Sequence, residues 1–251
     1  MNALDLMPTL LLTLFSLALV SGSALIVVVT RARRQRRLKV SFETQHFQFD
    51  SMIHPMANLF AHRPLTWVAV RSRNLQAVQN ALGLSNPHPC TWQQGLSSEQ
   101  KLFIAPPIQG WILITGSGLP DPFDDVDICF RFLIELSRKL GHVQFFSANS
   151  VVSHHAWVRA EAGCILRAYA WAGKTFWNQG IKTQAEIDLG MKCYRYCETP
   201  ETTLFGEPDL ALFNTEKVPQ LAAMWSIDPA AIDERIVGQS CGIAGEPRRL
   251  Y

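Results

Sequence analysis

The pattern of apolar and polar positions separates an uncharged apolar segment at the start of the chain from a longer region in which short apolar runs alternate with polar ones. From Leu6 to Thr30 no residue is charged, and Leu, Ile, Val, Ala and Phe predominate. The 24 residues of 6–29 would form a helix about 36 Å long, which is enough to cross a hydrocarbon core of about 30 Å. The pattern therefore predicts a transmembrane anchor over residues 1–30.

A cleaved signal peptide is the competing interpretation of this segment. Signal peptides begin with positive charge and carry an apolar stretch of about 7–15 residues. This chain begins Met-Asn-Ala-Leu-Asp, and its apolar stretch is much longer. We therefore expect the segment to be retained in the mature protein.

A dense basic run follows the apolar segment directly and indicates its orientation. It consists of Arg31, Arg33, Arg34, Arg36, Arg37 and Lys39. Basic residues next to a membrane span stay on the cytoplasmic side and attract anionic lipids. We therefore expect a single-pass protein of the inner cell membrane, with residues 31–63 as a juxtamembrane connector and the rest of the chain in the cytoplasm. The lipid bilayer is its first expected partner.

Residues 64–251 show the alternation of strands and helices expected of one soluble domain. Strands are predicted at 65–72, 101–107, 110–118 and 142–152, and a hairpin at 156–171. Helices are predicted at 75–82, 122–140, 184–197 and 218–225, and Asp228 and Pro229 open a further short one. Asn74 and Gly83 are expected to cap the first of these helices, and Thr183 and Glu186 are expected to form a capping box at the start of the third. We predict loops or connectors for "SNPHPCTWQQGLSS" and "TFWNQG", and no element in the tail "GQSCGIAGEPRRLY". The fold class is therefore α+β, with a mixed or antiparallel sheet and three to four helices.

The segment 122–140 has the clearest helical pattern. Asp121 is expected to cap its start, and Gly141 follows its end. The predicted buried stripe consists of Val126, Cys129, Phe130, Leu133, Leu136 and Leu140. Arg131 and Glu135 fall on the opposite, solvated face.

The register of the hairpin at 156–171 depends on its connecting residues. A two-residue turn would place Ala162 at positive φ, whereas a three-residue loop, 161–163, requires positive φ only at Gly163. We therefore predict the three-residue loop, which pairs Ala160 with Cys164, Trp157 with Arg167, and His155 with Tyr169.

Strand alternation then separates the adjacent histidines, so that His154 and His155 point to opposite faces. They cannot ligate one metal together while the strand is regular. The face with His155 carries the candidate ligand-binding residues, which are His155, Trp157, Arg159, Arg167 and Tyr169. Arginines among aromatic rings suit an anionic or planar ligand, or a protein surface. The alternatives are an arginine–aromatic ladder that only covers the sheet, and a general acid–base role for His155.

Other features predict neither a cofactor nor a metal. The "TGSGLPDP" segment lacks the spacing of a phosphate-binding loop. The six cysteines have no C-x-x-C spacing, and Cys193 and Cys197 are better explained as small apolar residues of a helix than as metal ligands. After residue 40, acidic residues slightly outnumber basic ones, so no nucleic-acid partner is expected.

Three segments, "ALGLSNPHPCTW", "KLFIAPPIQGWILITGSGLPDP" and "RAYAWAGKTFWNQG", resemble a group of uncharacterised bacterial proteins. The resemblance covers roughly residues 70–245. It implies one compact domain of bacterial origin and carries no activity, so it assigns no catalytic residue.

Two functions are compatible with this pattern. The first is a membrane-anchored binding or assembly domain that engages a membrane-associated protein. The second is a membrane-tethered enzyme that acts on a small anionic substrate at the His155 and Arg167 face. Because we find no catalytic signature, we expect the binding domain rather than the enzyme.

Overall fold

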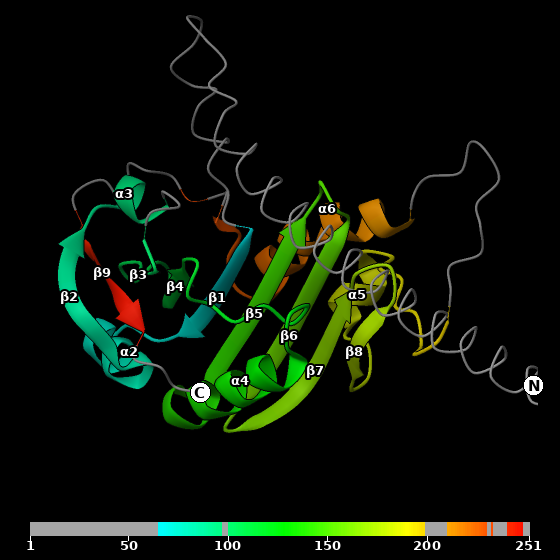
Figure 1. The fold of residues 1–251 in the computed structure, drawn as a ribbon, viewed down its shortest axis with the longest axis horizontal. Coiled ribbons are helices and arrows are strands. Elements are labelled where there is room, and N and C mark those ends of the chain that lie inside the picture. The colour runs from blue at the N-terminus through cyan, green and yellow to red at the C-terminus, as the bar shows by residue number, and fades with distance from the viewer. Residues whose placement is uncertain (1–64, 97–99, 199–209, 230–231, 233–239, 248–251) are drawn as a thin grey trace, which may run out of the picture. The chain divides into compact units, whose positions relative to one another are not determined.

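The computed structural model describes residues 65–96, 100–198, 210–229, 232 and 240–247 (Figure 1). The anchor predicted at 1–30 and the connector predicted at 31–63 lie outside the described residues. In the part of the chain that the structure describes, no helix is both long and apolar enough to cross a membrane.

The described domain is built on one nine-stranded sheet in the order β2-β9-β3-β4-β1-β5-β6-β7-β8 (Figure 1). The strands are β1 (Thr66–Arg71), β2 (Leu84–Cys90), β3 (Leu102–Ile104), β4 (Trp111–Thr115), β5 (His142–Asn149), β6 (His154–Glu161), β7 (Cys164–Trp171), β8 (Thr175–Gln179) and β9 (Gly242–Pro247). Every pairing in this sheet is antiparallel.

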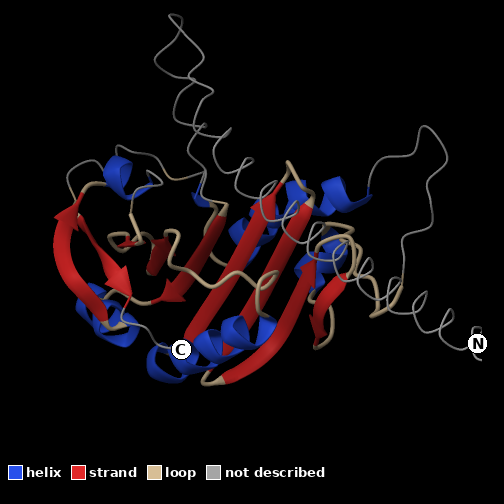
Figure 2. Ribbon diagram, viewed as in Figure 1, coloured by secondary structure: helices blue, strands red, loops and turns tan. Residues whose placement is uncertain are grey.

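Helices cover both faces of the sheet (Figure 2). They are α2 (Leu75–Leu82), α3 (Trp92–Leu96), α4 (Val126–Leu140), α5 (Gln184–Asp188) and α6 (Leu210–Trp225). Helices α2 and α4 pack on one face around Val68, Phe145 and Val158. The other face carries Trp67, Phe146 and Trp157, and it packs against α6 and the segment after α5. The predicted α+β class is confirmed.

The predicted caps of α2 and the predicted start of α5 are confirmed. The side chain of Asn74 accepts a hydrogen bond from the backbone of Ala77, and Gly83 closes α2 in the left-handed conformation, with φ of 59°. Thr183 and Glu186 form the predicted capping box of α5. These ends could be predicted because each depends on side chains only three or four residues from the helix end.

The three segments predicted to lack regular structure contain further elements, so that prediction is wrong. Strand β2 and helix α3 occupy the predicted loop, β8 occupies the predicted connector, and β9 lies in the tail. Strand β2 contains Pro87 and Pro89, which are tolerated because β2 is an edge strand. Strand β9 inserts tightly between β2 and β3, since a Cβ at Gly242 would lie 2.3 Å from the carbonyl oxygen of Ile104.

Other helix boundaries also differ from the prediction. Helix α4 begins at Val126 and is capped by Asp125, whose carboxylate accepts from the backbone of Asp127 and Ile128. Helix α5 ends at Asp188, so the segment with Cys193 and Cys197 is not helical. Helix α6 starts at 210, eight residues before the predicted start.

The buried stripe of α4 is also displaced from the predicted one. Phe132 is 5% exposed, whereas Phe130 is 37% exposed. Cys129, Leu133 and Leu136 are buried as predicted. Arg131 and Glu135 are exposed, which confirms the predicted outer face.

The register predicted for the hairpin of β6 and β7 is wrong. Glu161 pairs with Cys164 across a two-residue turn, 162–163. Beyond an irregularity at Leu166, which has no partner in β6, Arg159 pairs with Arg167, Trp157 with Tyr169, and His155 with Trp171. Over most of the hairpin the pairing is therefore displaced by two residues, and a displacement of two keeps each side chain on its face.

The two-residue turn forms although Ala162 has φ of 47° beside Gly163 at 81°. Positive φ at both central residues defines the turn whose twist matches that of the strands. The turn is also attached to the end of α4, because Ala162 donates its backbone N–H to Gly141 O at 2.9 Å, and Gly163 donates to Ser137 Oγ at 3.1 Å. Gly141 and Ser137 are distant from the turn in the sequence, so the conformational preferences of the turn residues alone could not predict it.

We expect substitutions at the two turn positions to change stability in opposite directions. Ala162→Asn should raise the free energy of unfolding by up to about 1 kcal/mol, because asparagine tolerates the left-handed conformation better than alanine. Gly163→Ala should lower the free energy of unfolding by about 1 kcal/mol, since the alanine would have to adopt positive φ and its Cβ would lie 3.4 Å from the side chain of Arg138. Urea unfolding of both variants measures the two shifts. Shifts of the same sign would contradict this turn geometry.

Candidate functional site

The five residues predicted to bind a ligand share one face of the sheet, on the side of α5 and α6. His155, Trp157, Arg167 and Tyr169 are each at most 1% exposed, and Arg159 is half-buried. His154 lies on the other face, where its ring contacts Phe123. The predicted clustering and the separation of the two histidines are confirmed, but four of the five side chains lie in the core instead of on an open surface.

Arg167 is held by a buried ion pair with Glu186. Its Nη2 lies 2.9 Å from Glu186 Oε1, and its Nε donates to the same oxygen at 2.9 Å. Its Nη1 donates to the carbonyl oxygens of Ala168 and Gln179 and to Asn178 Oδ1. These donors are used within the fold, so Arg167 serves mainly to fix α5 on the sheet.

Glu186 is fully buried and connects α5 to the strands. Besides Arg167, its carboxylate accepts from Trp157 Nε1 at 2.8 Å and from the backbone N–H of Thr183 at 2.7 Å. Burial raises the pKa of the neighbouring Cys193 thiol to about 11, so the thiol stays protonated at neutral pH. From the sequence alone, only the capping box pointed to a role for Glu186. Its contacts with Trp157 and Arg167 depend on how α5 packs on the strands, which the sequence does not reveal.

His155 lies inside a stack of aromatic rings and is bonded to α6. Its ring is stacked on those of Trp157 and Trp171, at centroid distances of 5.7 and 5.4 Å. Nδ1 lies 3.1 Å from Thr215 Oγ1, and the side-chain amide nitrogen of Asn214 lies 3.3 Å from Nε2. An amide N–H that donates to Nε2 requires a neutral ring there. These contacts make His155 a structural histidine that joins β6 to α6.

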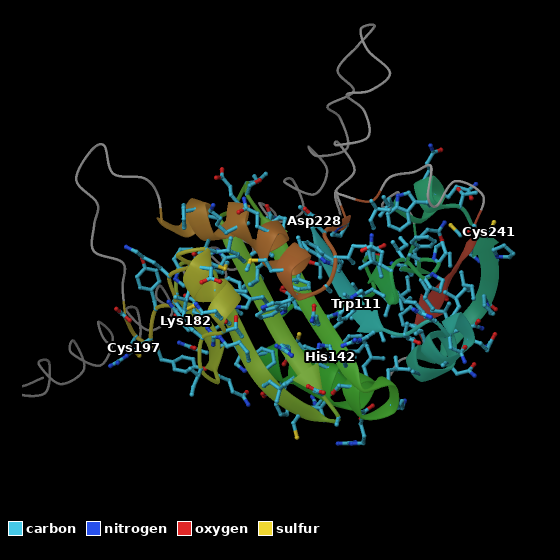
Figure 3. All side chains as sticks on the ribbon, turned by 180° about the vertical axis from the view of Figure 1, so that it is seen from behind. Trp111, His142, Lys182, Cys197, Asp228 and Cys241 are labelled. Carbon is cyan, nitrogen blue, oxygen red and sulfur yellow. The ribbon has the colours of Figure 1, made fainter. Side chains whose placement is uncertain are left out.

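Arg159 belongs to a second group at the open end of the same face. We call this group the His142 cluster, and it consists of Arg71, Trp111, His142, Gln144, Arg159 and Glu161. The strand register places its members side by side, with Arg71 opposite Trp111, His142 opposite Glu161, and Gln144 opposite Arg159. In Figure 3, Trp111 and His142 lie beyond the end of α6 rather than beneath it.

His142 is the centre of the contacts in this cluster. Its ring meets the edge of Trp111 at a centroid distance of 5.7 Å, and its Nδ1 lies 3.7 Å from Glu161 Oε2. The amide nitrogen of Gln144 lies 3.1 Å from Nε2 of His142 and donates to the carbonyl oxygen of Trp225, also at 3.1 Å. The cluster is therefore bonded directly to the last residue of α6.

The charges around His142 favour its neutral form. Burial lowers the pKa of His142 below its ordinary value of 6.5, and the guanidinium groups of Arg159 and Arg71 lower it further. The carboxylate of Glu161 opposes them. Neutral His142 accepts at Nε2 from Gln144 and carries its proton on Nδ1, toward Glu161.

Two polar atoms of the cluster are buried without a hydrogen-bond partner among the described residues. They are Gln144 Oε1 and Arg159 Nε. The Gln144 side chain is almost wholly enclosed, since the residue is 1% exposed. A buried acceptor left unpaired costs about 1–3 kcal/mol, so these atoms indicate a position that the fold alone does not satisfy.

Neither a metal site nor a serine nucleophile is supported by the geometry. Among the described residues, no group of three His, Cys, Asp or Glu side chains is placed to hold a metal ion. The residues at 238–242, "GQSCG", match the G-x-S-x-G pattern of hydrolases, so the interpretation that the sequence lacks this motif and any other catalytic signature is wrong. That pattern places its serine between a strand and a helix, whereas Ser240 precedes strand β9.

The chain matches no protein-family model, no curated protein and no solved structure in comparisons with known proteins. The resemblance to uncharacterised bacterial proteins therefore stays a prediction from the three quoted segments.

Proposed function

We propose that this chain is a single-pass protein of the inner cell membrane whose domain at 64–251 lies in the cytoplasm and binds a membrane-associated protein. The uncharged segment at 6–29 and the six basic residues of 31–39 support the anchor and its orientation. The same basic residues would contact anionic lipid headgroups.

The observation that carries the binding role is the half-exposed His142 cluster. Two guanidinium groups, an imidazole and an indole gather there, at the end of the sheet next to α6. Arg71 is exposed, and Trp111, His142 and Arg159 are half-buried. Arginine and tryptophan are the residue types that contribute most at binding surfaces. This group offers an accessible combination of charge and aromatic surface.

The alternative, an enzyme with its site at His155 and Arg167, receives less support. Both residues are 1% exposed, and each is bonded to a helix or loop that covers it. A substrate would have to displace α6 or α5 to reach them. We therefore favour the binding role.

The orientation is tested with a reporter fused after Tyr251. We expect a cytoplasm-dependent fluorescent reporter to be active at this end and a periplasm-dependent phosphatase to be inactive. Sequencing of the N-terminus of the purified protein tests the anchor. A mature chain that starts after Arg31 would refute the retained anchor, and an active phosphatase would refute the orientation.

The binding role is tested by crosslinking in cells and purification of the full-length chain. The matched control is residues 1–63 alone, with the same tag. We expect a membrane-associated protein to be enriched with the full-length chain and absent from the control. Equal recovery with both would place the contact in the anchor or connector, and would refute a binding role for the domain.

A further inference from the structure

We propose that the His142 cluster binds a small oxyanion, a carboxylate or a phosphate. This inference rests on the proposed binding role of the domain and names the ligand chemistry of the site. Its elements are the guanidinium groups of Arg71 and Arg159 and the imidazole of His142.

The charge balance at the cluster favours an anion. Three charged groups act on His142 in the described structure, namely Arg159, Arg71 and Glu161. Two are cations and one is an anion, and Nδ1 of His142 lies 3.7 Å from Oε2 of Glu161. The excess positive charge belongs to guanidinium groups, whose planar N–H donors match the oxygens of a carboxylate or phosphate.

Arg167, which lies next to Arg159 on the same face, is an arginine whose guanidinium group has a carboxylate partner within the fold. Arg159 pairs with Arg167 across β6 and β7. Arg167 has Glu186 as its carboxylate, 2.9 Å away. For Arg159, no ion pair occurs within the described residues, and its Nε has no hydrogen-bond partner there. A bound oxyanion would supply the partner that Glu186 supplies to Arg167.

The buried amide of Gln144 holds the ring of His142 in position. Its nitrogen is occupied by His142 and by the carbonyl oxygen of Trp225, and this arrangement fixes the orientation of the amide. Its Oε1 then remains as a buried acceptor. Because Gln144 is 1% exposed and is bonded to α6, this acceptor lies in the interior of the cluster, and the ligand binds at the guanidinium groups beside it.

Binding should be coupled to the protonation of His142. An anion beside the ring reduces the effect of the two arginines and favours the imidazolium form, which raises the pKa of His142. By linkage, affinity for the anion must then rise as the pH falls through that pKa. The groups that face the ring are Arg71 from β1, Arg159 and Glu161 from β6, and the amide of Gln144 from β5, with Trp111 from β4 on its edge.

The experiment uses the full-length chain in an uncharged detergent and measures binding by calorimetry. The probes are glycerate and glycerol 3-phosphate, which share hydroxyl donors but differ in the oxyanion, and glycerol as the neutral control. We expect saturable binding of at least one anion and none of glycerol. Arg159→Gln should weaken that binding about 10-fold or more, which corresponds to one charge-assisted hydrogen bond.

The matched control is Arg131→Gln, on the exposed face of α4. Among the described residues, Arg131 bonds only to a backbone oxygen of its own helix, so its replacement should leave anion binding unchanged. Circular dichroism of each variant establishes that it is folded. Failure of both anions to bind, or equal effects of Arg159→Gln and Arg131→Gln, would overturn the site.

A second measurement keeps the inference testable if the arginine variants unfold. Histidine labelled with carbon-13 reports the pKa of His142 by NMR, with His142→Asn for assignment and exposed His88 as an internal reference. Saturating glycerate should raise the pKa of His142, and the signals of His88 serve as the reference. An unchanged pKa of His142 would also overturn the proposal.

Two further measurements distinguish a lipid headgroup from a soluble anion, and the oxyanion site from the binding role of the domain. The pKa of His142 is compared in phosphatidylcholine nanodiscs with and without phosphatidylglycerol. A rise with phosphatidylglycerol alone identifies the lipid headgroup as the source, and a rise only with added glycerate or glycerol 3-phosphate identifies a soluble anion. If no anion binds but the domain still captures its membrane partner, the oxyanion site fails and the binding role stands.

Discussion

Replacement of Glu186 by alanine will lower the free energy of unfolding by about 3–5 kcal/mol, because it leaves a buried guanidinium without its carboxylate. Arg167 is 1% exposed and Glu186 is fully buried. The carboxylate also accepts from Trp157 and Thr183, so the substitution leaves donors of three residues without a partner. Urea unfolding of the full-length chain, followed by circular dichroism, measures the loss.

Two variants show whether this loss comes from the buried charge. Glu186→Gln keeps the shape of the side chain and should cost less than Glu186→Ala. In the double variant Arg167→Met with Glu186→Leu, the buried charge is absent, so the loss should be smaller than the sum of the two single losses. Additive losses would mean that the two side chains stabilise the fold independently. Glu135→Ala, on the exposed face of α4, should cost at most about 1 kcal/mol and serves as the control.

The features that could be predicted from sequence depend on neighbours along the chain. The cap at Asn74, the closing Gly83 and the capping box at Thr183 each involve residues within one helical turn. Strands β1, β4 and β5 are recognisable because both faces of the sheet are covered, which produces nearly continuous apolar runs. The antiparallel sheet follows from the hairpins that join consecutive strands.

The features that could not be predicted depend on partners far along the chain. Strand β9 pairs with β2 and β3, more than 130 residues earlier, and its sequence, Gly-Ile-Ala-Gly-Glu-Pro, has little strand character of its own. Its glycines are required by the close approach of neighbouring strands. The hairpin turn likewise depends on Gly141 and Ser137 of the α4 end.

The candidate site was predicted only in part for the same reason. Alternation along β6 and β7 correctly placed His155, Trp157, Arg159, Arg167 and Tyr169 on one face. Whether that face is open depends on α5 and α6, which cover four of the five residues. Only Arg159 reaches the open end of the sheet. Its neighbours there, Arg71, Trp111 and His142, come from three other strands, and only the register brings them together.

The second large effect that we expect is a difference in stability loss between alanine variants of Phe130 and Phe132. It depends on which side of α4 faces the sheet. Phe132 is 5% exposed and packs in the core between α4 and the sheet. Phe132→Ala should therefore lower the free energy of unfolding by about 3–5 kcal/mol. Phe130 is 37% exposed, and its ring meets the edge of Trp177 at a centroid distance of 6.0 Å. Phe130→Ala should cost less, about 1–2 kcal/mol, because it removes one edge-to-face contact and the burial of a ring that is already partly in solvent.

The predicted buried stripe of α4 contained Phe130 and left out both Phe132 and Ser137. Ser137 is in fact fully buried, and its hydroxyl donates to Ile134 O and accepts from the backbone of Gly163. With Ser137 inside, the buried stripe consists of Cys129, Phe132, Leu133, Leu136 and Ser137. Phe130 and Phe132 are separated by about 200° around the helix axis, so they cannot both face the sheet. Urea unfolding of both alanine variants distinguishes the two facings. A larger loss for Phe130→Ala than for Phe132→Ala would mean that α4 presents its other face to the sheet.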